Sequence, residues 1–237
     1  MRIVVLFLKN LFGVLLNILF PPVCVACGAF IPDQSVFVCH ACFDALTINT
    51  ALTCPACGGR RPMAFSPCHK TPYVLAAACK YHDPIPQLVW YFKYHKLEQL
   101  RVLLSALLIT HLSRALPNTS SYIVSYIPLH PRKERERGFN QSRLLAQMVA
   151  DYSRVPCVAL LARARYTESQ TKQKNRVDRL SNVADCFTCV HPEICKGKNI
   201  LLVDDVSTSG GTLLAATHIL RVHHARSVIG LVVAKVE

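Results

Sequence analysis

The stretch that decides the fold covers residues 200–212 and reads ILLVDDVSTSGGT. Its first four residues form a continuous apolar run, which is typical of a central parallel strand buried on both faces. Two acids, Asp204 and Asp205, follow the run, and small hydroxyl residues and glycines come next. Residues 212–224 then have the apolar spacing of a helix. The order predicts a buried strand over 199–203, a polar loop and a helix.

This loop has the composition of a phosphate-binding site. Glycines and small residues let backbone N–H groups converge on an anion, and the helix N-terminus beyond adds free donors. Carboxylates accept hydrogen bonds from sugar hydroxyls, so the two acids beside the loop suit a sugar phosphate. A plain strand and helix with one Ser or Thr N-cap would explain only one hydroxyl. The candidate site residues are Asp204, Asp205, Val206, Ser207, Thr208, Ser209, Gly210, Gly211 and Thr212.

Two other nucleotide-binding motifs are excluded. The loop is not closed by the Gly-Lys-Ser/Thr of a P-loop, and G-x-G-x-x-G is absent from the chain.

Working outward, apolar strand-like runs alternate with helical patterns from residue 122 onward. This alternation predicts an α/β fold with a mostly parallel sheet flanked by helices, whose ligands bind beyond the carboxyl ends of the strands. A long helical stretch over 87–116 precedes it, and residues 163–180 are polar and basic, which indicates a long loop. The remaining expected strands are 122–127, 157–161, 184–190 and 227–234, and the remaining expected helix is 139–152.

A second expected strand end carries a cluster of cations. The strand over 122–127 is followed by a sharp turn, and four basic residues come within six positions after it. A tight turn with cations suits a pyrophosphate group, whereas a solvated basic helix start is the alternative. The residues concerned are Pro128, Leu129, His130, Arg132, Lys133, Arg135 and Arg137.

The overall composition limits the class of protein. The 237 residues suit one sizeable domain with a small appendage, and 51% hydrophobic residues exclude wholesale disorder. A net charge of +13 favours polyanionic partners such as nucleotides, pyrophosphate, nucleic acid or an anionic membrane, although a merely basic surface has the same composition. The sequence shows no basic patch interleaved with aromatic residues of the kind that stacks single strands.

The cysteines indicate a metal-organised lobe near the N-terminus. Eight of the 12 lie between Cys24 and Cys79, and three early pairs have C-x-x-C spacing. Disulfide scaffolds are usually short secreted chains, whereas converging C-x-x-C turns in a mid-sized chain indicate zinc. A closed structural site is expected from Cys24, Cys27, Cys39 and Cys42, and a second site from Cys54, Cys57 and Cys68. The other cysteines are expected as small buried residues: Cys79, Cys157, Cys186, Cys189 and Cys195.

Residues 1–20 are apolar, but polar residues interrupt them along one narrow arc of a helix. This pattern predicts an amphipathic helix, ended by Pro21 and Pro22, because a membrane span needs about 20 nearly uninterrupted apolar residues. A signal peptide is disfavoured because Lys9 lies within the apolar run and no small-x-small cleavage site follows. We therefore expect a cytoplasmic protein without a transmembrane span.

The segment from Val203 to Thr212 resembles the motif with which type I phosphoribosyltransferases bind phosphoribosyl pyrophosphate (PRPP). In that family the paired acids hold the ribose 2- and 3-hydroxyls and the following loop wraps the 5-phosphate. The resemblance therefore implies these roles for Asp204 and Asp205, and for the loop from Ser207 to Thr212. Mg²⁺ is implied together with PRPP, bridging the pyrophosphate and the sugar hydroxyls.

Three further motifs resemble the ComF family of competence-associated proteins. They are LFPPxCxxC over 19–27, IPLHPR with ERGFNQ over 127–141, and Thr167, Gln170, Arg179 and Asn182 before Phe187. The resemblance implies a type I phosphoribosyltransferase-like fold behind a small zinc-binding lobe, with a flap over 167–182. The corresponding division is a helix over 1–22, the zinc lobe over 23–79 and the main domain over 80–237, with a hood over 80–117.

The resemblance leaves two functions open. One is transfer of a phosphoribosyl group from PRPP to an unknown acceptor, linked to DNA uptake; no pattern in the hood identifies the acceptor, and Lys93 is a weak candidate for a phosphate contact. The other is a non-enzymatic nucleic-acid-binding or regulatory protein that retains a PRPP-sensing site, with single-stranded DNA or a competence helicase as partner.

One departure from the family concerns the second zinc site. ComF-like chains often have a fourth cysteine three positions after the third, and that position is Thr71 here. His69 is a substitute ligand, although adjacent residues such as Cys68 and His69 rarely face one ion together.

Overall fold

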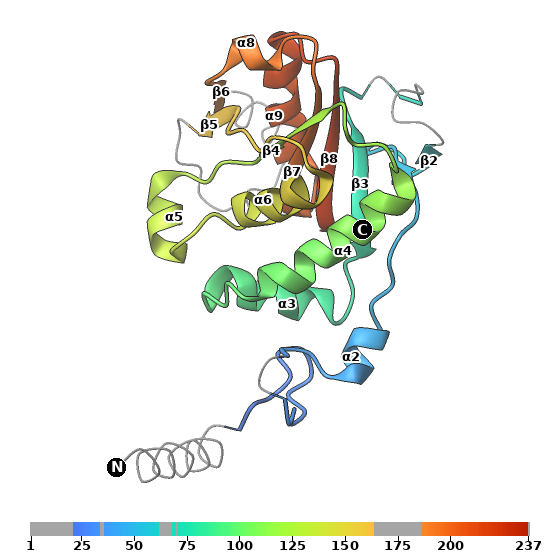
Figure 1. Cartoon of the computed structure of the whole chain (residues 1–237), viewed down its shortest axis with the longest axis vertical. Helices are drawn as coiled ribbons and strands as arrows, with labels where there is room; N and C mark the ends of the chain where they lie inside the picture. Colours follow the sequence, from blue (N-terminus) through green and yellow to red (C-terminus); the bar gives the residue numbers. More distant parts are fainter. Residues whose placement is uncertain (1–20, 34–35, 62–67, 70, 164–185, 237) are drawn as a thin grey trace.

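The computed structural model describes residues 21–33, 36–61, 68–69, 71–163 and 186–236 (Figure 1). The expected helix over 1–20, nearly all of the expected loop over 163–180 and the family flap over 167–182 lie outside these residues.

A six-stranded, mostly parallel sheet forms the centre of the described chain. The four strands on one side of it are mutually parallel, and the two short strands at the other edge are antiparallel. The sheet order is β2 (Arg60–Arg61), β1 (Leu52–Thr53), β3 (Val74–Lys80), β8 (Ser227–Lys235), β7 (Asn199–Ser207) and β4 (Tyr122–Tyr126). This is the predicted α/β architecture.

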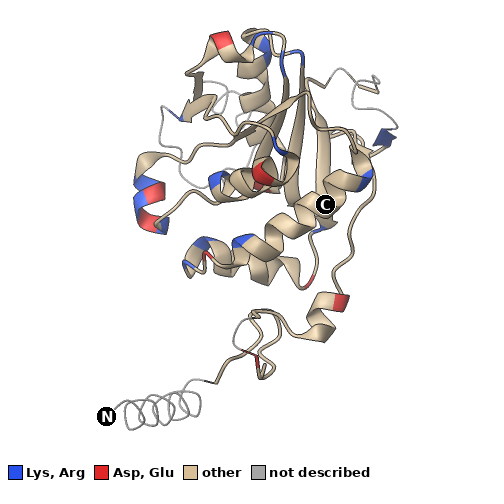
Figure 2. Cartoon of the chain, in the orientation of Figure 1, with Lys and Arg blue, Asp and Glu red and all other residues tan. Residues whose placement is uncertain are grey.

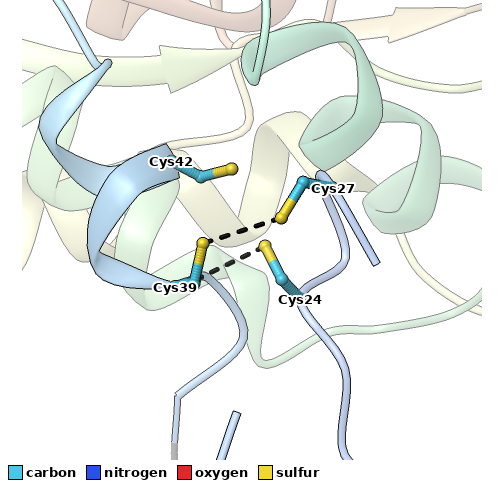
Figure 3. A group of neighbouring side chains, drawn as sticks. All are labelled: Cys24, Cys27, Cys39 and Cys42. Carbon is cyan, nitrogen blue, oxygen red and sulfur yellow. Dashed lines mark hydrogen bonds between the residues drawn. The ribbon is translucent and has the colours of Figure 1, made fainter. Parts of the chain in front are cut away.

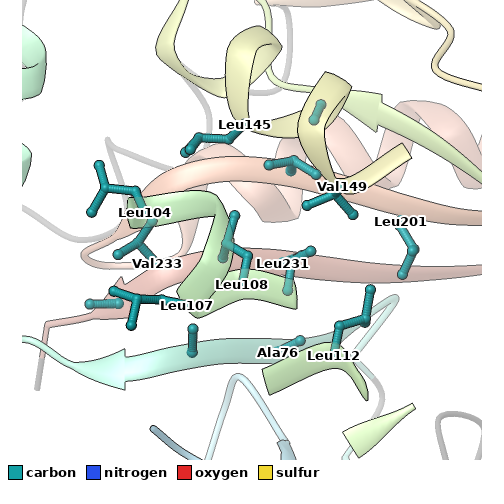
Figure 4. Packing of buried hydrophobic residues seen from close by; sticks show 14 of the residues in the cluster. Ala76, Leu104, Leu107, Leu108, Leu112, Leu145, Val149, Leu201, Leu231 and Val233 are labelled. Carbon is teal, nitrogen blue, oxygen red and sulfur yellow. The ribbon is translucent and has the colours of Figure 1, made fainter. Parts of the chain in front are cut away.

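Helices cover both faces of the sheet. On one face lie α4 (Leu100–Ala115) and α6 (Gln141–Ser153), and on the other lies α9 (Gly211–Val222) with the hairpin of β5 (Leu161–Arg163) and β6 (Phe187–Cys189). Alternate residues of β7 supply the two cores, because successive side chains of a strand point to opposite faces. Leu201 packs among leucines and valines of α4, α6 and β8 (Figure 4), whereas Leu202 packs on the α9 side.

The strand β3 is a finding that the sequence did not predict. Its apolar run pairs in parallel with β8 and is buried from Val74 to Cys79. The sequence placed these residues in the zinc lobe because cysteine-rich segments surround them. The sheet therefore extends across the expected boundary at residues 79 and 80, and β1 ties the preceding segment to β3 through the Thr53 and Leu75 pair.

The expected helix over 87–116 is two helices. The first, α3 (Ile85–Tyr94), ends at His95, and Lys96 has a φ of 55°, a left-handed conformation that a continuing helix excludes. The chain turns there and restarts at Leu100 as α4. A uniform apolar spacing on both sides of the turn concealed the break from the sequence.

Three other expectations need correction. The strand over 199–203 continues to Ser207, so the acids lie within β7 rather than after it. The strand over 157–161 is wrong: Cys157 makes one isolated bridge to Val124, and β5 begins only at Leu161. The sharp basic turn is a short helix, α5 (Pro131–Arg137).

Candidate functional site

The acid pair lies near the carboxyl end of β7, where helices α3 and α6 meet the sheet edge. The Ser142 hydroxyl on α6 donates to Asp204 Oδ1 at 2.9 Å, and Lys93 Nζ on α3 lies 2.7 Å from Asp205 Oδ1. The backbone N–H of Asp205 also donates to Asp204 Oδ1 at 2.9 Å. Both carboxylates are therefore fixed in place, and Asp205 is only 7% exposed.

Burial dominates the electrostatics of this pair. It raises the pKa of Asp204 to about 7, with the charge of Asp205 adding to the effect and Lys93 and Ser142 opposing it. Burial alone would lower the pKa of Lys93, but Asp205 and then Asp204 attract its proton, and the net pKa of Lys93 is raised. Lys93 thus stays charged beside two acids that repel each other, so the site favours added positive charge or hydrogen-bond donors.

The loop after the acids is open to a ligand. Thr208 and Ser209 are exposed, and Gly210 and Gly211 are half-buried rather than packed in the core. Gly210 has a φ of 77°, and a Cβ there would lie 3.1 Å from the Tyr73 hydroxyl oxygen, so both backbone conformation and space require glycine.

The helix after this loop begins without a side-chain cap. Gly210 occupies the N-cap of α9 and supplies no side-chain hydrogen bond to its first turn. The first N–H groups of an uncapped helix are donors without intrahelical partners, and the helix dipole makes them favourable to an anion. The predicted arrangement of strand, loop and helix is thus present with the donors that a phosphate requires.

The end of β4, which the sequence predicted as a second ligand-binding strand end, lies next to the end of β7. After β4, the backbone N–H of Ile127 donates to the Val203 carbonyl at 2.9 Å, and the side chain of Asn140 donates to the Ile127 carbonyl at 3.1 Å. Asn140 also caps α6 by accepting from the N–H of Arg143 at 3.2 Å. The structure therefore joins Pro128 and Leu129 to the sheet edge that carries the acids.

The cations of α5 divide into two groups. Arg132 lies 3.1 Å from Glu136, on an exposed part of the helix where acids and bases intermingle (Figure 2), and His130 caps the helix by accepting from the N–H of Arg132. Arg137 instead donates to Gln141 at 3.1 Å, and its guanidinium lies 5.4 Å from the centroid of Tyr94. Arg132 therefore fits the alternative interpretation of a solvated basic helix start, whereas the side chain of Arg137 turns toward α3 and α6.

The first cysteine set converges as predicted (Figure 3). The four sulfur atoms of Cys24, Cys27, Cys39 and Cys42 lie within 4.8 Å of one another, and Cys27 Sγ lies 3.6 Å from Cys39 Sγ. Tetrahedral zinc with Zn–S bonds of about 2.3 Å places its sulfur ligands about 3.8 Å apart. The residues therefore fit a closed structural zinc site.

The second set gains the ligand that the sequence left open. His69 Nδ1 lies 3.6 Å from Cys54 Sγ and 3.3 Å from Cys68 Sγ, and Cys57 belongs to the same group. The adjacent Cys68 and His69 do face one point, contrary to the general rule applied to the sequence. Three thiolates and one imidazole fit a second structural zinc site.

Two further features differ from the sequence predictions. Trp90 and Tyr94 lie one turn apart on α3 and are 50% and 61% exposed, and the guanidinium of Arg137 lies over the Tyr94 ring, so an aromatic and basic surface does exist. The expectation of uniformly buried cysteines fails at Cys157 and Cys189, which are only half-buried.

The residues that the sequence missed surround the acids. Ser142 carried no signal of its own, and Asn140 and Gln141 appeared only as part of a family motif without an assigned role. Lys93 had only a weak assignment, because the pairing of α3 with the end of β7 is a tertiary contact.

No helix in the part of the chain that the structure describes is long and apolar enough to cross a membrane.

Both parts of the chain are similar to known proteins. Residues 140–236 match the phosphoribosyl transferase domain family, and residues 15–80 match the double zinc ribbon domain family. The chain is 28% identical to competence protein ComFC of Bacillus subtilis over 202 residues, which cover 80% of this chain and 79% of ComFC. It is 29% identical to the DNA utilization protein YhgH of Salmonella typhi over 214 residues, covering 84% and 91%.

Among solved structures, glutamine PRPP amidotransferase from B. subtilis is similar with a TM-score of 0.39 and 19% identity, covering 56% of this chain and 26% of that one. The family matches span the acid pair, the loop after it and both metal clusters. They agree with the mostly parallel sheet and with the convergence of the cysteines. The chain is thus similar to ComF competence proteins over most of its length, and it joins a double zinc ribbon to a domain with the phosphoribosyltransferase-type fold.

Proposed function

We propose that this chain is a competence-linked phosphoribosyltransferase that binds PRPP and Mg²⁺ at the carboxyl end of β7. The similarity to ComFC and YhgH supports the link to DNA uptake, because these relatives are named as a competence protein and a DNA utilization protein. The phosphoribosyl transferase domain match supports the class of ligand. The observation that carries the proposal is the acid pair, half-buried Asp204 and buried Asp205, directly before an open loop and a helix without a side-chain cap.

Each part of PRPP has a matching part of the site. Asp204 and Asp205 accept the ribose hydroxyls, and the loop from Ser207 to Thr212 donates backbone N–H groups and hydroxyls to the 5-phosphate. The phosphate is remote from the breaking bond, so its binding energy serves to position the reacting carbon. The segment from Pro128 to Arg137 starts at the same sheet edge, and its last residue, Arg137, lies against α3 and α6, so we assign the diphosphate to these two parts of it.

The residues present fit a divalent cation that arrives with the ligand. The two carboxylates lie side by side near the end of β7, and the pKa of Asp204 is raised by burial first and by the charge of Asp205 second. Asp204 and Asp205 would help to hold Mg²⁺ with the ligand, and the ion would supply positive charge to offset that of the leaving group. Arg137 adds a fixed positive charge for the departing pyrophosphate.

Titration calorimetry of Mg²⁺–PRPP into the zinc-loaded protein tests the proposal. Replacing Asp205 by Asn removes charge-assisted hydrogen bonds worth about 1.5–3 kcal/mol, so we expect the affinity to fall at least about tenfold. Asp151→Asn is the matched control, because Asp151 is an exposed acid on α6 whose side chain accepts a hydrogen bond from Gln147, away from the site. Equal affinities for the wild type and Asp205→Asn would contradict the role of the acid pair.

Turnover requires a separate assay. Transfer breaks the bond between C1 of the ribose and the diphosphate and forms a bond to the acceptor. With water as the acceptor, the products are ribose 5-phosphate and pyrophosphate. We expect slow pyrophosphate release by the wild type and none above background by Asp205→Asn. Binding without any release, whatever acceptor is added, supports a sensor rather than an enzyme.

One observation favours the second candidate, a nucleic-acid-binding protein. The exposed rings of Trp90 and Tyr94, with Arg137 over the Tyr94 ring, offer the stacking surface and positive charge that single strands use. In that case Trp90→Ala with Tyr94→Ala lowers a salt-sensitive affinity for single-stranded DNA, and Asp205→Asn leaves it unchanged. Loss of DNA binding in Asp205→Asn alone would argue against a separate nucleic-acid surface.

A further inference from the structure

Lys93 is held at the acid pair by a rigid part of α3. The preceding residue, Phe92, is fully buried, and its ring lies 5.4 Å from that of Phe139 at the start of the segment leading into α6. The backbone of Lys93 is therefore anchored in the core. Its four-carbon side chain is flexible, so the ammonium group can move between partners while the backbone stays in place.

The ammonium group occupies an acceptor atom that a ligand needs. Lys93 Nζ lies 2.7 Å from Asp205 Oδ1, and the two side chains are 19% and 10% exposed. A sugar hydroxyl that is to donate to Asp205 must compete with a charged donor at hydrogen-bond distance. Charge-assisted hydrogen bonds are stronger than neutral ones, so a hydroxyl alone competes poorly.

Lys93 also lies close enough to Arg137 to be repelled by it. Arg137 opposes the charge on Lys93, while the two acids support that charge. The guanidinium of Arg137 is held by Gln141 and the Tyr94 ring, so it keeps its place when Lys93 moves. A ligand anion between the two cations turns this repulsion into attraction for both of them. A diphosphate has the charge and the number of oxygens for two such partners.

We propose, on the basis of the function proposed above, that Lys93 changes partner when PRPP binds. In the free protein it neutralises Asp205, and in the complex it releases Asp205 to the ribose hydroxyls and binds the diphosphate together with Arg137. Lys93 is then a residue that determines specificity. Ribose 5-phosphate, which lacks the diphosphate, must displace Lys93 from Asp205 without providing it with a new partner.

The test compares two ligands and two variants. Dissociation constants for Mg²⁺–PRPP and for ribose 5-phosphate are measured with the wild type, Lys93→Met and Lys93→Gln. We expect both variants to bind Mg²⁺–PRPP at least about tenfold more weakly, since one hydrogen bond to a charged group is lost. Their affinity for ribose 5-phosphate is expected to stay the same or increase, because the charged competitor for Asp205 is gone. Lys198→Met, an exposed lysine before β7, controls for the change in net charge.

The outcomes separate the inference from the function on which it rests. If the wild type binds neither ligand, the proposed function itself fails. If the wild type binds PRPP and the variants lose affinity for both ligands equally, Lys93 only positions the acids and the exchange is wrong. Unchanged PRPP affinity in either variant would also contradict the proposed exchange of partners by Lys93. Glutamine retains a donor for Asp205, so Lys93→Gln decides the matter if Lys93→Met does not fold.

Discussion

The first zinc ribbon and the central sheet of this chain are stabilised in different ways. Among described residues 21–33 and 36–44, Cys24 and Ile31 are the buried hydrophobic ones. In β7, by contrast, the four residues from Ile200 to Val203 are fully buried between two layers of helices and hairpin. The ribbon has too little core to fold without metal, whereas the sheet has a core of its own.

The second zinc cluster is stabilised in a way intermediate between that of the first ribbon and that of the sheet. Cys54 is buried, and β1, which ends at Thr53, pairs with β3 of the sheet. Its metal site and its strand pairing therefore support each other. The three regions therefore depend on metal and on core packing to different degrees. We expect different structural effects when each zinc cluster is lost and when the core is damaged.

Loss of zinc from the first cluster has the largest expected effect. Structural zinc in small domains supplies about 10–16 kcal/mol, so Cys39→Ser should unfold the ribbon and leave the sheet folded. Limited proteolysis with mass spectrometry should then show cleavage within residues 21–44, while residues 71–163 stay protected. Cys157→Ser, a half-buried cysteine outside both clusters, is the control. Simultaneous cleavage of the sheet would contradict the independence of the two regions.

Loss of the imidazole ligand from the second cluster should have a smaller structural effect. We expect His69→Ala to reduce the zinc content from two ions per chain to one, with the sheet and the first cluster intact. His69→Cys keeps a ligand in the same place and should retain both ions. The measurement is elemental analysis of the purified protein, and two retained ions in His69→Ala would show that His69 is no ligand.

Damage to the sheet core should lower stability without affecting zinc. Leu201→Ala removes a fully buried side chain, which costs about 2–5 kcal/mol. Thermal unfolding should therefore occur at a lower temperature with the zinc content unchanged. Val222→Ala, at a position 55% exposed, should change stability by less than about 0.5 kcal/mol. A loss of zinc in Leu201→Ala would mean that the core and the ribbons fold as one unit.

The smallest expected effect is a pH dependence within the sheet itself. The pKa of Asp204 is about 7 in the folded chain against an ordinary value of 3.8, so the folded state binds a proton that the unfolded state has lost. Raising the pH through this window therefore lowers stability. Asp204→Asn removes the effect, so its stability advantage over the wild type should grow between pH 4 and pH 8, by a few kcal/mol at most. An advantage that does not change with pH would contradict the shifted pKa.

The sequence predicted those parts of the chain whose signals are local. The apolar run before Asp204, the glycines after it and the C-x-x-C spacing of Cys24 and Cys27 each reflect a requirement of the residues around them. The parallel sheet followed from the alternation of such segments. The resemblance to ComF added roles that no spacing could supply.

What the sequence did not predict depends on contacts between distant segments. Nothing near Lys93 indicates that α3 ends against β7, and the apolar pattern runs on through the turn at Lys96. His69 joins the second cysteine cluster only because the chain brings it to Cys54, 15 residues away. β3 was hidden because its apolar residues follow a cysteine-rich segment, and only its pairing with β8 identifies it as part of the sheet.

The most direct test of the central claim is a crystal structure of the zinc-loaded protein soaked with PRPP and Mg²⁺. We predict the 5-phosphate within the loop from Ser207 to Thr212 and the ribose hydroxyls on Asp204 and Asp205. The opposite result is a phosphate that, at saturating ligand, lies away from this loop while the two carboxylates still contact Lys93 and Ser142.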